Sequence, residues 1–431
     1  MRAQPDAVLA HLVDVLNRHL GEQRAERGPT PTERMATFFD RPVRELSSVH
    51  TELGAVRELC VAWTLDELAH HHPEATLHSA SAYEETPSRR HVDLGDVERF
   101  LPSSCLVTWP AGTLDAEVPL ATLKSMAPTP SAEPSQVLRV VGPPEAPEAA
   151  RRALQQLRDH ADGPGNVLRG RVLHIREDRG LLLDPVATPS ATREQLVLPD
   201  AVWEAVQRNV ASAFARREAL AAAGLWSSRG LLLQGPAGTG KSTLARTLAG
   251  EVAGTATVIV AEATSIVRRV HELYRELTTL TPALVVIEDL DLLVGNRSGR
   301  PDRSAALQTL LSALDHAHRT YEGVVTLATT NEPGGLDASV TRAGRFEETV
   351  TLAAPDQRSR AAILARYLAP LGLDEPALLT RLAHLTPGAT GADLARLCRT
   401  AILAAEGAPG AEDLLAAARP DDEPANLGTY L

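Results

Sequence analysis

The first 130 residues alternate between helical and strand-like patterns of apolar positions. Apolar residues at positions 8, 9, 12, 13 and 16 recur at helical spacing and predict a helix over residues 7–20, and a similar pattern covers residues 56–68. From residue 91 to 126 the apolar runs are shorter and are separated by Pro, Gly and Ser, and APTPSAEPS at 127–135 is typical of a linker. We therefore expect a first region of mixed helices and strands over residues 1–130.

The next 60 positions predict a small α+β unit. QVLRVV at 136–141 has the pattern of a strand, EAARRALQQLRDHA at 148–161 that of a helix, and two further runs around EDR at 177–179 that of a hairpin. We expect a separate module and connector over residues 131–190, too small to be stable without a neighbouring domain.

The second half contains apolar runs that end abruptly in polar residues. LLLQ at 231–234, LVVI at 284–287 and VVTLATT at 324–330 are nearly continuous, as is typical of parallel strands buried on both faces. We expect an α/β domain over residues 191–355, a helical domain over 356–419 and a disordered acidic tail over 420–431.

Composition and charge narrow the class of protein. The 431 residues are 44% hydrophobic and 23% charged, an ordinary composition for globular domains, and the formal net charge of -12 predicts no general basic face. Nucleic acid and anionic membranes are therefore disfavoured as main partners. No apolar run approaches the roughly 18 residues of a membrane-spanning helix, and the N-terminus lacks the pattern of a signal peptide.

The cysteines indicate a reducing compartment. Cys60, Cys105 and Cys398 lie far apart and have no spacing typical of a zinc site or a disulfide framework. We expect a cytoplasmic protein.

The strongest motif is the glycine-rich stretch GPAGTGKST, which follows the apolar run at 231–234 and matches the pattern GxxxxGK[ST]. In this pattern backbone amides turn toward phosphates, the lysine adds a positive charge, and the serine hydroxyl is available to Mg²⁺. The predicted nucleotide-binding residues are Gly235, Pro236, Ala237, Gly238, Thr239, Gly240, Lys241, Ser242 and Thr243.

Two further strands end in residues suited to phosphate chemistry. LVVIEDLD at 284–291 places Glu288 and Asp289 directly after four apolar residues, where an acid can hold a metal ion. The strand at 324–330 is followed by Asn331, whose amide could orient a water molecule beside the phosphates.

Arg342 and Arg345 follow in the segment LDASVTRAGRFEE. Two guanidinium groups at this spacing suit a γ-phosphate presented by a neighbouring subunit, because such an arginine finger stabilises charge in the transition state.

Taken together, residues from about 197 to 419 resemble an AAA+ ATPase module of the AAA branch, which includes Cdc48, the proteasomal ATPases and FtsH. The glycine-rich loop, the acidic strand, TTNEP, RxGRF and TPGATGADLARLCRTA at 386–401 occur in that family's order. The resemblance implies a P-loop NTPase fold, with a parallel sheet flanked by helices, a C-terminal helical lid and, here, a preceding α+β region. It also implies ATP and Mg²⁺ as ligands and a homo-oligomeric ring, usually a hexamer.

The resemblance assigns roles to individual residues. Lys241 contacts phosphate, Ser242 and Glu288 serve Mg²⁺, Asp289 is the general base and Asn331 is the sensor, while Arg342 and Arg345 act on the neighbouring subunit's nucleotide. In the lid, Thr390 and Asp393 suggest a capping box for a helix that packs Cys398 in its core.

The acid pair departs from the family, which usually has Asp before Glu. Either Glu288 takes the metal position and Asp289 the base position, or Asp289 takes the metal position and Leu290 leaves the base position empty. The first alignment fits better, because it keeps four apolar residues before the first acid and an acidic Asp291 after the pair. A Glu-Asp order also occurs in AAA proteins similar to the mitochondrial chaperone of the Rieske protein, which suggests that the order is compatible with turnover. We expect hydrolysis, but slow, because the exchange changes the reach of each acid by about 1.5 Å.

The region of the central pore departs as well. Unfolding members of the family carry an aromatic residue there, whereas this chain has Ser265, Ile266 and Val267, and Tyr274 has the spacing of a packed helical residue. A second pore segment at 295–304 carries three arginines, which form either a solvated loop or a basic rim for an acidic partner.

We therefore expect an ATP-dependent remodelling or assembly chaperone whose N-terminal region selects an unknown protein client. The alternatives are a nucleotide-gated scaffold with little hydrolysis and, with less support from the acidic balance, a DNA-directed AAA+ loader.

Overall fold

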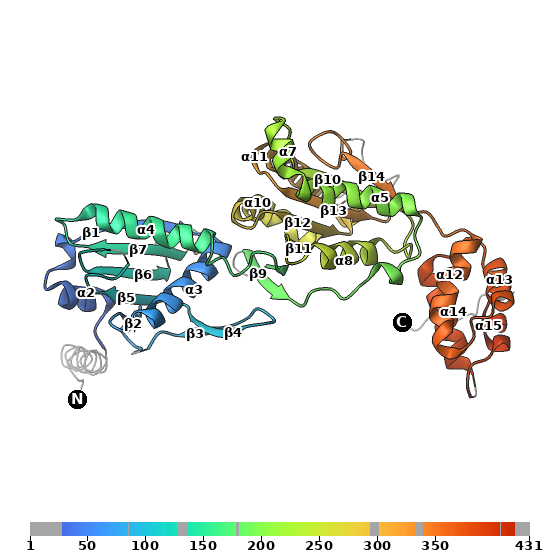
Figure 1. Ribbon diagram of the computed structural model, residues 1–431, viewed down its shortest axis with the longest axis horizontal. Helices are drawn as coiled ribbons and strands as arrows, with labels where there is room; N and C mark the ends of the chain where they lie inside the picture. Colours follow the sequence, from blue (N-terminus) through green and yellow to red (C-terminus); the bar gives the residue numbers. More distant parts are fainter. Residues whose placement is uncertain are drawn as a thin grey trace, which may run out of the picture. The chain divides into compact units, whose positions relative to one another are not determined.

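The computed structural model describes residues 28–84, 86–114, 116–126, 136–177, 181–293, 301–332, 339–405 and 407–418. The chain forms two compact units, the first ending at Leu168 and the second beginning at Arg169 (Figure 1). The helix expected at 7–20, the linker at 127–135, most of the second pore segment and the acidic tail lie outside the described residues.

The first unit is built on a five-stranded antiparallel sheet with the order β1-β7-β6-β5-β2. Its strands are β1 (Ser47–Leu53), β2 (Thr76–Ser79), β5 (Cys105–Trp109), β6 (Leu120–Met126) and β7 (Gln136–Gly142). A separate two-stranded ribbon consists of β3 (Arg89–Asp93) and β4 (Glu98–Pro102). The helices are α2 (Pro31–Phe39), α3 (Ala55–His71) and α4 (Pro147–Asp162).

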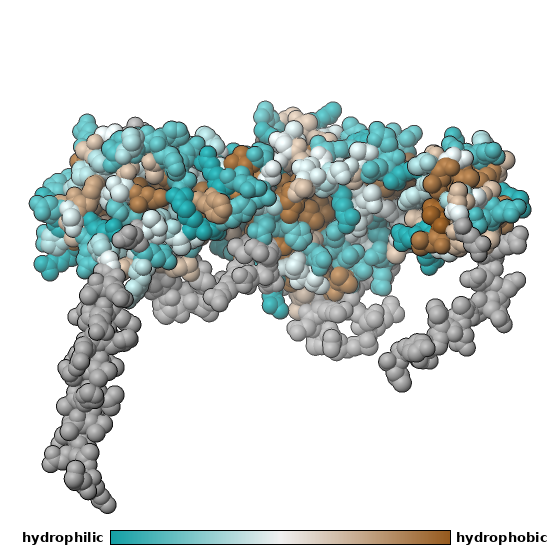
Figure 2. All heavy atoms as spheres, turned by 90° about the horizontal axis from the view of Figure 1, so that it is seen from below, coloured by the Kyte–Doolittle hydropathy of each residue, from teal (hydrophilic) through white to brown (hydrophobic). Residues whose placement is uncertain are grey.

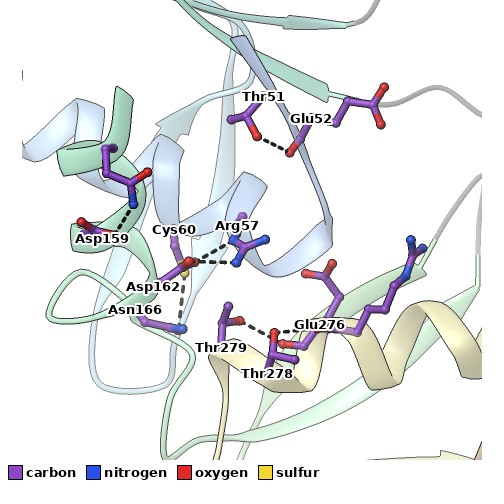
Figure 3. Close-up of polar contacts among 12 residues, drawn as sticks. Thr51, Glu52, Arg57, Cys60, Asp159, Asp162, Asn166, Glu276, Thr278 and Thr279 are labelled. Atoms are coloured by element: carbon purple, nitrogen blue, oxygen red, sulfur yellow. Dashed lines mark hydrogen bonds and ion pairs between the residues drawn. The ribbon is translucent and has the colours of Figure 1, made fainter. Parts of the chain in front are cut away.

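Helices α3 and α4 pack together beside this sheet. Apolar residues of α4 recur at helical spacing and are buried, while its arginines at 151 and 152 are exposed, so one stripe of the helix faces the sheet. Arg57 of α3 donates two hydrogen bonds to Asp162 at the end of α4, at 2.8 and 2.9 Å, and the Cys60 thiol contacts Asn166 (Figure 3). These contacts fasten the two helices to each other.

The second unit is built on a seven-stranded sheet with the order β14-β10-β13-β12-β11-β8-β9. Only β9 runs antiparallel to its neighbour. The strands are β8 (Val172–Glu177), β9 (Leu181–Val186), β10 (Arg229–Gln234), β11 (Thr257–Glu262), β12 (Ala283–Glu288), β13 (Val324–Thr330) and β14 (Glu348–Thr351).

Helices flank this sheet, and a helical lid follows it. The flanking helices are α5 (Asp200–Asn209), α6 (Ala211–Ala215), α7 (Arg217–Ala222), α8 (Lys241–Val252), α9 (Ala263–Ile266), α10 (Val270–Glu276) and α11 (Pro301–Thr320). The lid contains α12 (Gln357–Leu368), α13 (Pro376–Leu385), α14 (Gly391–Ala404) and α15 (Ala411–Ala417) around its own apolar cluster. Short 3-10 helices lie at Val43–Glu45, Arg193–Gln195, Val267–Arg269, Leu277–Thr279, Leu290–Leu293 and Ala369–Leu371.

The fold class expected from the sequence is confirmed: an α/β sheet domain with C-terminal helices follows an antiparallel α+β region. The 131–190 segment, however, does not form a separate module. Strand β7 pairs with β1 and β6 in the first unit, whereas the β8–β9 hairpin extends the second sheet beside β11. Strand pairing makes this division, because Val140 of β7 and Leu173 of β8 are both fully buried but lie in different sheets.

None of the helices in the described part of the chain is both long and apolar enough to cross a membrane.

Candidate nucleotide-binding site

The glycine-rich loop connects β10 to α8 at the carboxyl edge of the parallel sheet, which is where open α/β sheets bind ligands. Gly238 has φ +79°, and a Cβ atom there would lie 2.6 Å from Thr390 Oγ1 and 2.7 Å from Ala392 Cβ in the lid. The Ala392 N–H also donates to the Gly238 carbonyl, at 3.2 Å. The start of α14 therefore rests directly on the loop, and only glycine fits at 238.

Lys241, the first residue of α8, points back into this loop. Its Nζ donates hydrogen bonds to the carbonyls of Gly235 and Pro236, each at 2.8 Å. Burial lowers the pKa of Lys241, and the negative charges of Asp291 and Asp289 oppose this shift. The ammonium group thus lies in the electrostatic field of the acids that follow β12.

The two acids of LVVIEDLD differ in position. Glu288 is the last residue of β12; its side chain is 18% exposed, and its Oε1 atom lies 3.9 Å from a guanidinium nitrogen of Arg246 on α8. That buried oxygen has no hydrogen-bond partner within the described residues. Leu290 is fully buried, so the position after the pair belongs to the core.

Asp289 begins the turn after the strand, with φ +56°. Its backbone N–H donates to Thr329 Oγ1 at 3.0 Å, and Asn331 Nδ2 lies 3.4 Å from its Oδ1 atom. The Asn331 backbone N–H donates to Asp291 at 2.9 Å. The structure therefore brings Asp289 and Asn331 together at the ends of neighbouring strands.

The donor set suits Mg²⁺ held partly by a nucleotide. No group of three or more His, Cys, Asp or Glu side chains is placed to hold a metal within the described ranges. Mg²⁺ usually takes only one or two carboxylates, together with substrate phosphates and water. The Glu288 oxygen, which makes no hydrogen bond within the described residues, and the hydroxyl of Ser242, on the first turn of α8, could supply this limited protein contribution.

A cavity of about 560 Å³ extends from the glycine-rich loop to the lid. This volume lies in the range of small-molecule sites. Residues 195–199, before α5, and α12 residues of the lid line part of this cavity, and Leu196, Ile363 and Tyr367 provide apolar surface there. The Arg366 guanidinium of α12 donates to the Gln195 carbonyl and so ties the lid to this segment.

Sequence reasoning missed this end of the cavity. The apolar run LVLP at 196–199 directly precedes α5 and was the available signal, but it is too short to be distinguished from a buried strand.

The two predicted finger arginines have different environments. Arg345 is 17% exposed and donates to Asp315 of α11 from Nε and Nη2 at 2.9 to 3.1 Å, and from Nη1 to the Ser339 carbonyl at 2.8 Å. Arg342 is exposed, and its side chain has no hydrogen bond or ion pair within the described residues. Arg345 is therefore engaged within its own chain, whereas Arg342 is available to a neighbour.

A family model described as "ATPase family associated with various cellular activities (AAA)" matches residues 231–353, from β10 to just beyond β14.

Residues 231–353 form an AAA ATPase domain.

Similar proteins include FtsH proteases and ATPase family gene 2 homologues. The "ATP-dependent zinc metalloprotease FtsH 1" of Symbiobacterium thermophilum is 38% identical over 188 residues, covering 41% of this chain and 32% of that protein. The "ATPase family gene 2 protein homolog B" of Rattus norvegicus is 28% identical over 440 residues, covering 92% of this chain and 54% of that protein. The mouse protein of the same name is 36% identical over 198 residues. The chain thus spans about a third of the FtsH relative and about half of the rat relative.

The AAA domain implies ATP binding, and members of its family are typically oligomeric.

The residues at which the sequence predicts a pore loop are helical in the structure. Helix α9, the 3-10 helix Val267–Arg269 and α10 follow one another without a break. Tyr274 is buried in α10, and its hydroxyl lies 2.7 Å from Thr326 Oγ1, which confirms that it packs in the core. Burial raises the Tyr274 pKa far above its ordinary value of 10.0.

Two predictions for the lid are confirmed. Thr390 and Asp393 form the expected capping box of α14. Cys398 is buried in the lid cluster, where burial raises its thiol pKa.

Proposed function

We propose that this chain is a Mg²⁺-dependent ATP hydrolase that remodels or assembles a protein client as a homo-oligomeric ring, with a hexamer the expected size. The observation that carries this proposal is the convergence of Lys241, Asp289 and Asn331 at one edge of the AAA sheet, beside a cavity of nucleotide size.

In this proposal the loop amides and Lys241 hold the phosphates, and Ser242 and Glu288 hold Mg²⁺. The ion would supply positive charge against the phosphate oxygens. Asp289 accepts the proton of the attacking water, and Asn331 orients that water through its amide. Three observations support this distribution of roles: the contact between Asp289 and Asn331, the buried Glu288 oxygen that makes no hydrogen bond within the described residues, and the burial of Leu290.

The exchanged acids should make hydrolysis slow. Asp is one methylene shorter than Glu, a difference in reach of about 1.5 Å. A general base must lie within hydrogen-bonding distance of the water that it activates, so a shorter base demands tighter positioning.

The ring proposal rests on an arginine that one chain would supply to the γ-phosphate bound by its neighbour. Arg345 is paired with Asp315, so Arg342 is the better candidate for the finger that reaches a neighbour's γ-phosphate. Exposed apolar residues on the sheet domain and on the lid also suit contacts between copies: Leu225 is 58% exposed, Trp226 55% and Leu403 79%. Figure 2 shows apolar surface on the lid.

The first unit is the candidate client-binding domain. The rat relative aligns over 92% of this chain, so the similarity extends well beyond the AAA domain. The unbroken helices of the pore segment give no support to threading of an unfolded chain through an aromatic grip. Three free, buried cysteines are compatible with a reducing, cytoplasmic setting.

Purified protein should hydrolyse ATP only with Mg²⁺, and Lys241→Ala should abolish both turnover and ATP binding. Absence of Mg²⁺-dependent turnover in the unmodified chain, with ATP binding retained, would favour the nucleotide-gated scaffold. Sequence-independent DNA binding that persists at physiological salt would favour the DNA-directed loader.

A further inference from the structure

Strand β1 is the longest open sheet edge in the described part of the chain. It ends the five-stranded sheet and pairs with β7 along all seven of its residues, from Ser47 to Leu53. In Figure 1 it lies at the rim of the sheet beyond β7. Within the described ranges no other strand pairs with its outer side, so its outward N–H and C=O groups face away from the sheet.

The other sheet edges are shorter or carry features that block pairing. Strands β2 and β14 have four residues each, and β9 contains Pro185. In the five-residue strands of the β3–β4 ribbon, five of the ten residues are charged, and β4 ends in Pro102. Natural proteins protect edges with short strands, charges and prolines, and β1 has only one acidic residue, no Lys or Arg, and no proline or glycine.

The side chains of β1 alternate between exposed and half-buried positions, as is usual for a regular strand. Ser48, His50 and Glu52 are exposed on one face, while Val49 and Thr51 are half-buried on the face of the sheet that α4 contacts. Valine and threonine favour extended backbone. The other side chains of β1 belong to two serines, His50, Glu52 and Leu53, and four of these five are polar.

We infer that the outer edge of β1 binds an extended, unfolded segment of a protein client by adding it to the sheet as a sixth strand. Main-chain hydrogen bonds supply the affinity in such strand addition, and side-chain pockets supply the selectivity. Because pairing of this kind uses the main chain, it suits clients of varied sequence that share an extended, proline-free stretch. This inference rests on the proposed function only in naming the partner a client.

The test measures hydrogen–deuterium exchange in the full chain without nucleotide, with reduced and carboxymethylated α-lactalbumin as a permanently unfolded probe. Val49→Lys places a charged side chain at the edge, where its stem can lie along the sheet while its ammonium group blocks an added strand. Val49→Thr is the matched control, because it keeps a β-branched residue. Thr51→Lys replaces Val49→Lys if that variant has a lowered melting temperature.

We expect the probe to slow amide exchange in residues 47–53 of the unmodified chain and of Val49→Thr, and the lysine variant to bind it at least about tenfold more weakly. Probe binding with unchanged exchange at 47–53, or equal binding by the lysine variant, would overturn the inference. So would slowed exchange that depends on chain concentration without the probe, since the edge would then pair with a second copy. Lys241→Ala should retain the protection, which separates this result from failure of the ATPase proposal.

Discussion

Asp289 adopts φ +56°, a left-handed conformation that Asp and Asn reach more readily than other residues with side chains. The turn directs the carboxylate toward Asn331 while Leu290 enters the core. The residue at position 289 must therefore both adopt a left-handed backbone conformation and carry a carboxylate. Asn is the substitution that removes the charge and keeps the turn.

Measurements of stability and activity should distinguish Arg342 from Arg345, the two arginines predicted from the sequence to act as fingers. Arg345→Ala removes a forked ion pair with Asp315 and should lower the free energy of unfolding by about 2 kcal/mol, because hydrogen bonds to a charged group are lost. The exposed Arg342→Ala should change it by less than about 0.5 kcal/mol, yet reduce ATPase activity of the assembled protein. Denaturant unfolding and ATPase assays on both variants check this, and equal stability would refute the distinction.

At the level of elements, the contact between the loop and α14 should depend on Gly238. Gly238→Ala introduces a Cβ atom 2.6 Å from Thr390 Oγ1, so the lid must move, and ATP affinity should fall by at least about tenfold. Gly388→Ala is the control: its φ of +74° is equally unfavourable for alanine, but nothing lies within 4 Å of the added atom. Equal affinities of the two variants, measured by titration calorimetry, would contradict this role of the lid.

The cap of α14 should make the lid sensitive to acid. The Thr390 backbone N–H and hydroxyl donate to Asp393 and lower the pKa of its carboxyl below the ordinary 3.8. Because the folded pKa is lower than the unfolded one, the ionised cap stabilises the lid above the unfolded value and ceases to do so as pH falls through the folded value.

Asp393→Asn should therefore lower the melting temperature near neutral pH, and the difference from the unmodified chain should shrink below about pH 4. Thr390→Ala should behave alike, and the double variant should add little to either, since all three changes remove one cap. A difference that stays constant from pH 7 to pH 3 would show that the cap charge is not involved.

For the whole molecule, the two units should respond differently to nucleotide. Binding at about 100 times the dissociation constant stabilises the binding unit by about 2.7 kcal/mol. ATP with Mg²⁺ should therefore slow hydrogen exchange throughout the core of the second unit and leave β5 and α3 of the first unit unchanged. Lys241→Ala should remove the effect, and equal protection of both units would contradict independent stability.

The sequence predicts those parts of the molecule that local patterns determine. The apolar run before Glu288, the glycines before Lys241 and the Thr390–Asp393 cap each depend on a few neighbouring residues. Pairing between distant segments could not be read in this way. Val140 and Leu173 lie in similar apolar runs, and only the sheets that they join assign them to different units.

The candidate site shows the same limit. The spacing of Lys241, Asp289 and Asn331 indicated their convergence, but the partner of Arg345, Asp315 on α11, lies in a different element of the chain. Residues 195–199 likewise line the cavity together with the lid helix α12, which is distant in the sequence, so their role could not be predicted from their own pattern.

The central claim is that Glu288 and Asp289 have exchanged the usual roles of the two acids. Its most direct test is Mg²⁺-dependent ATP turnover of Asp289→Asn beside the unmodified chain, with ATP binding measured on the same samples. Loss of the base should reduce turnover by about 10² to 10⁴-fold while binding and melting temperature stay unchanged. Turnover by Asp289→Asn at the rate of the unmodified chain would contradict the exchange.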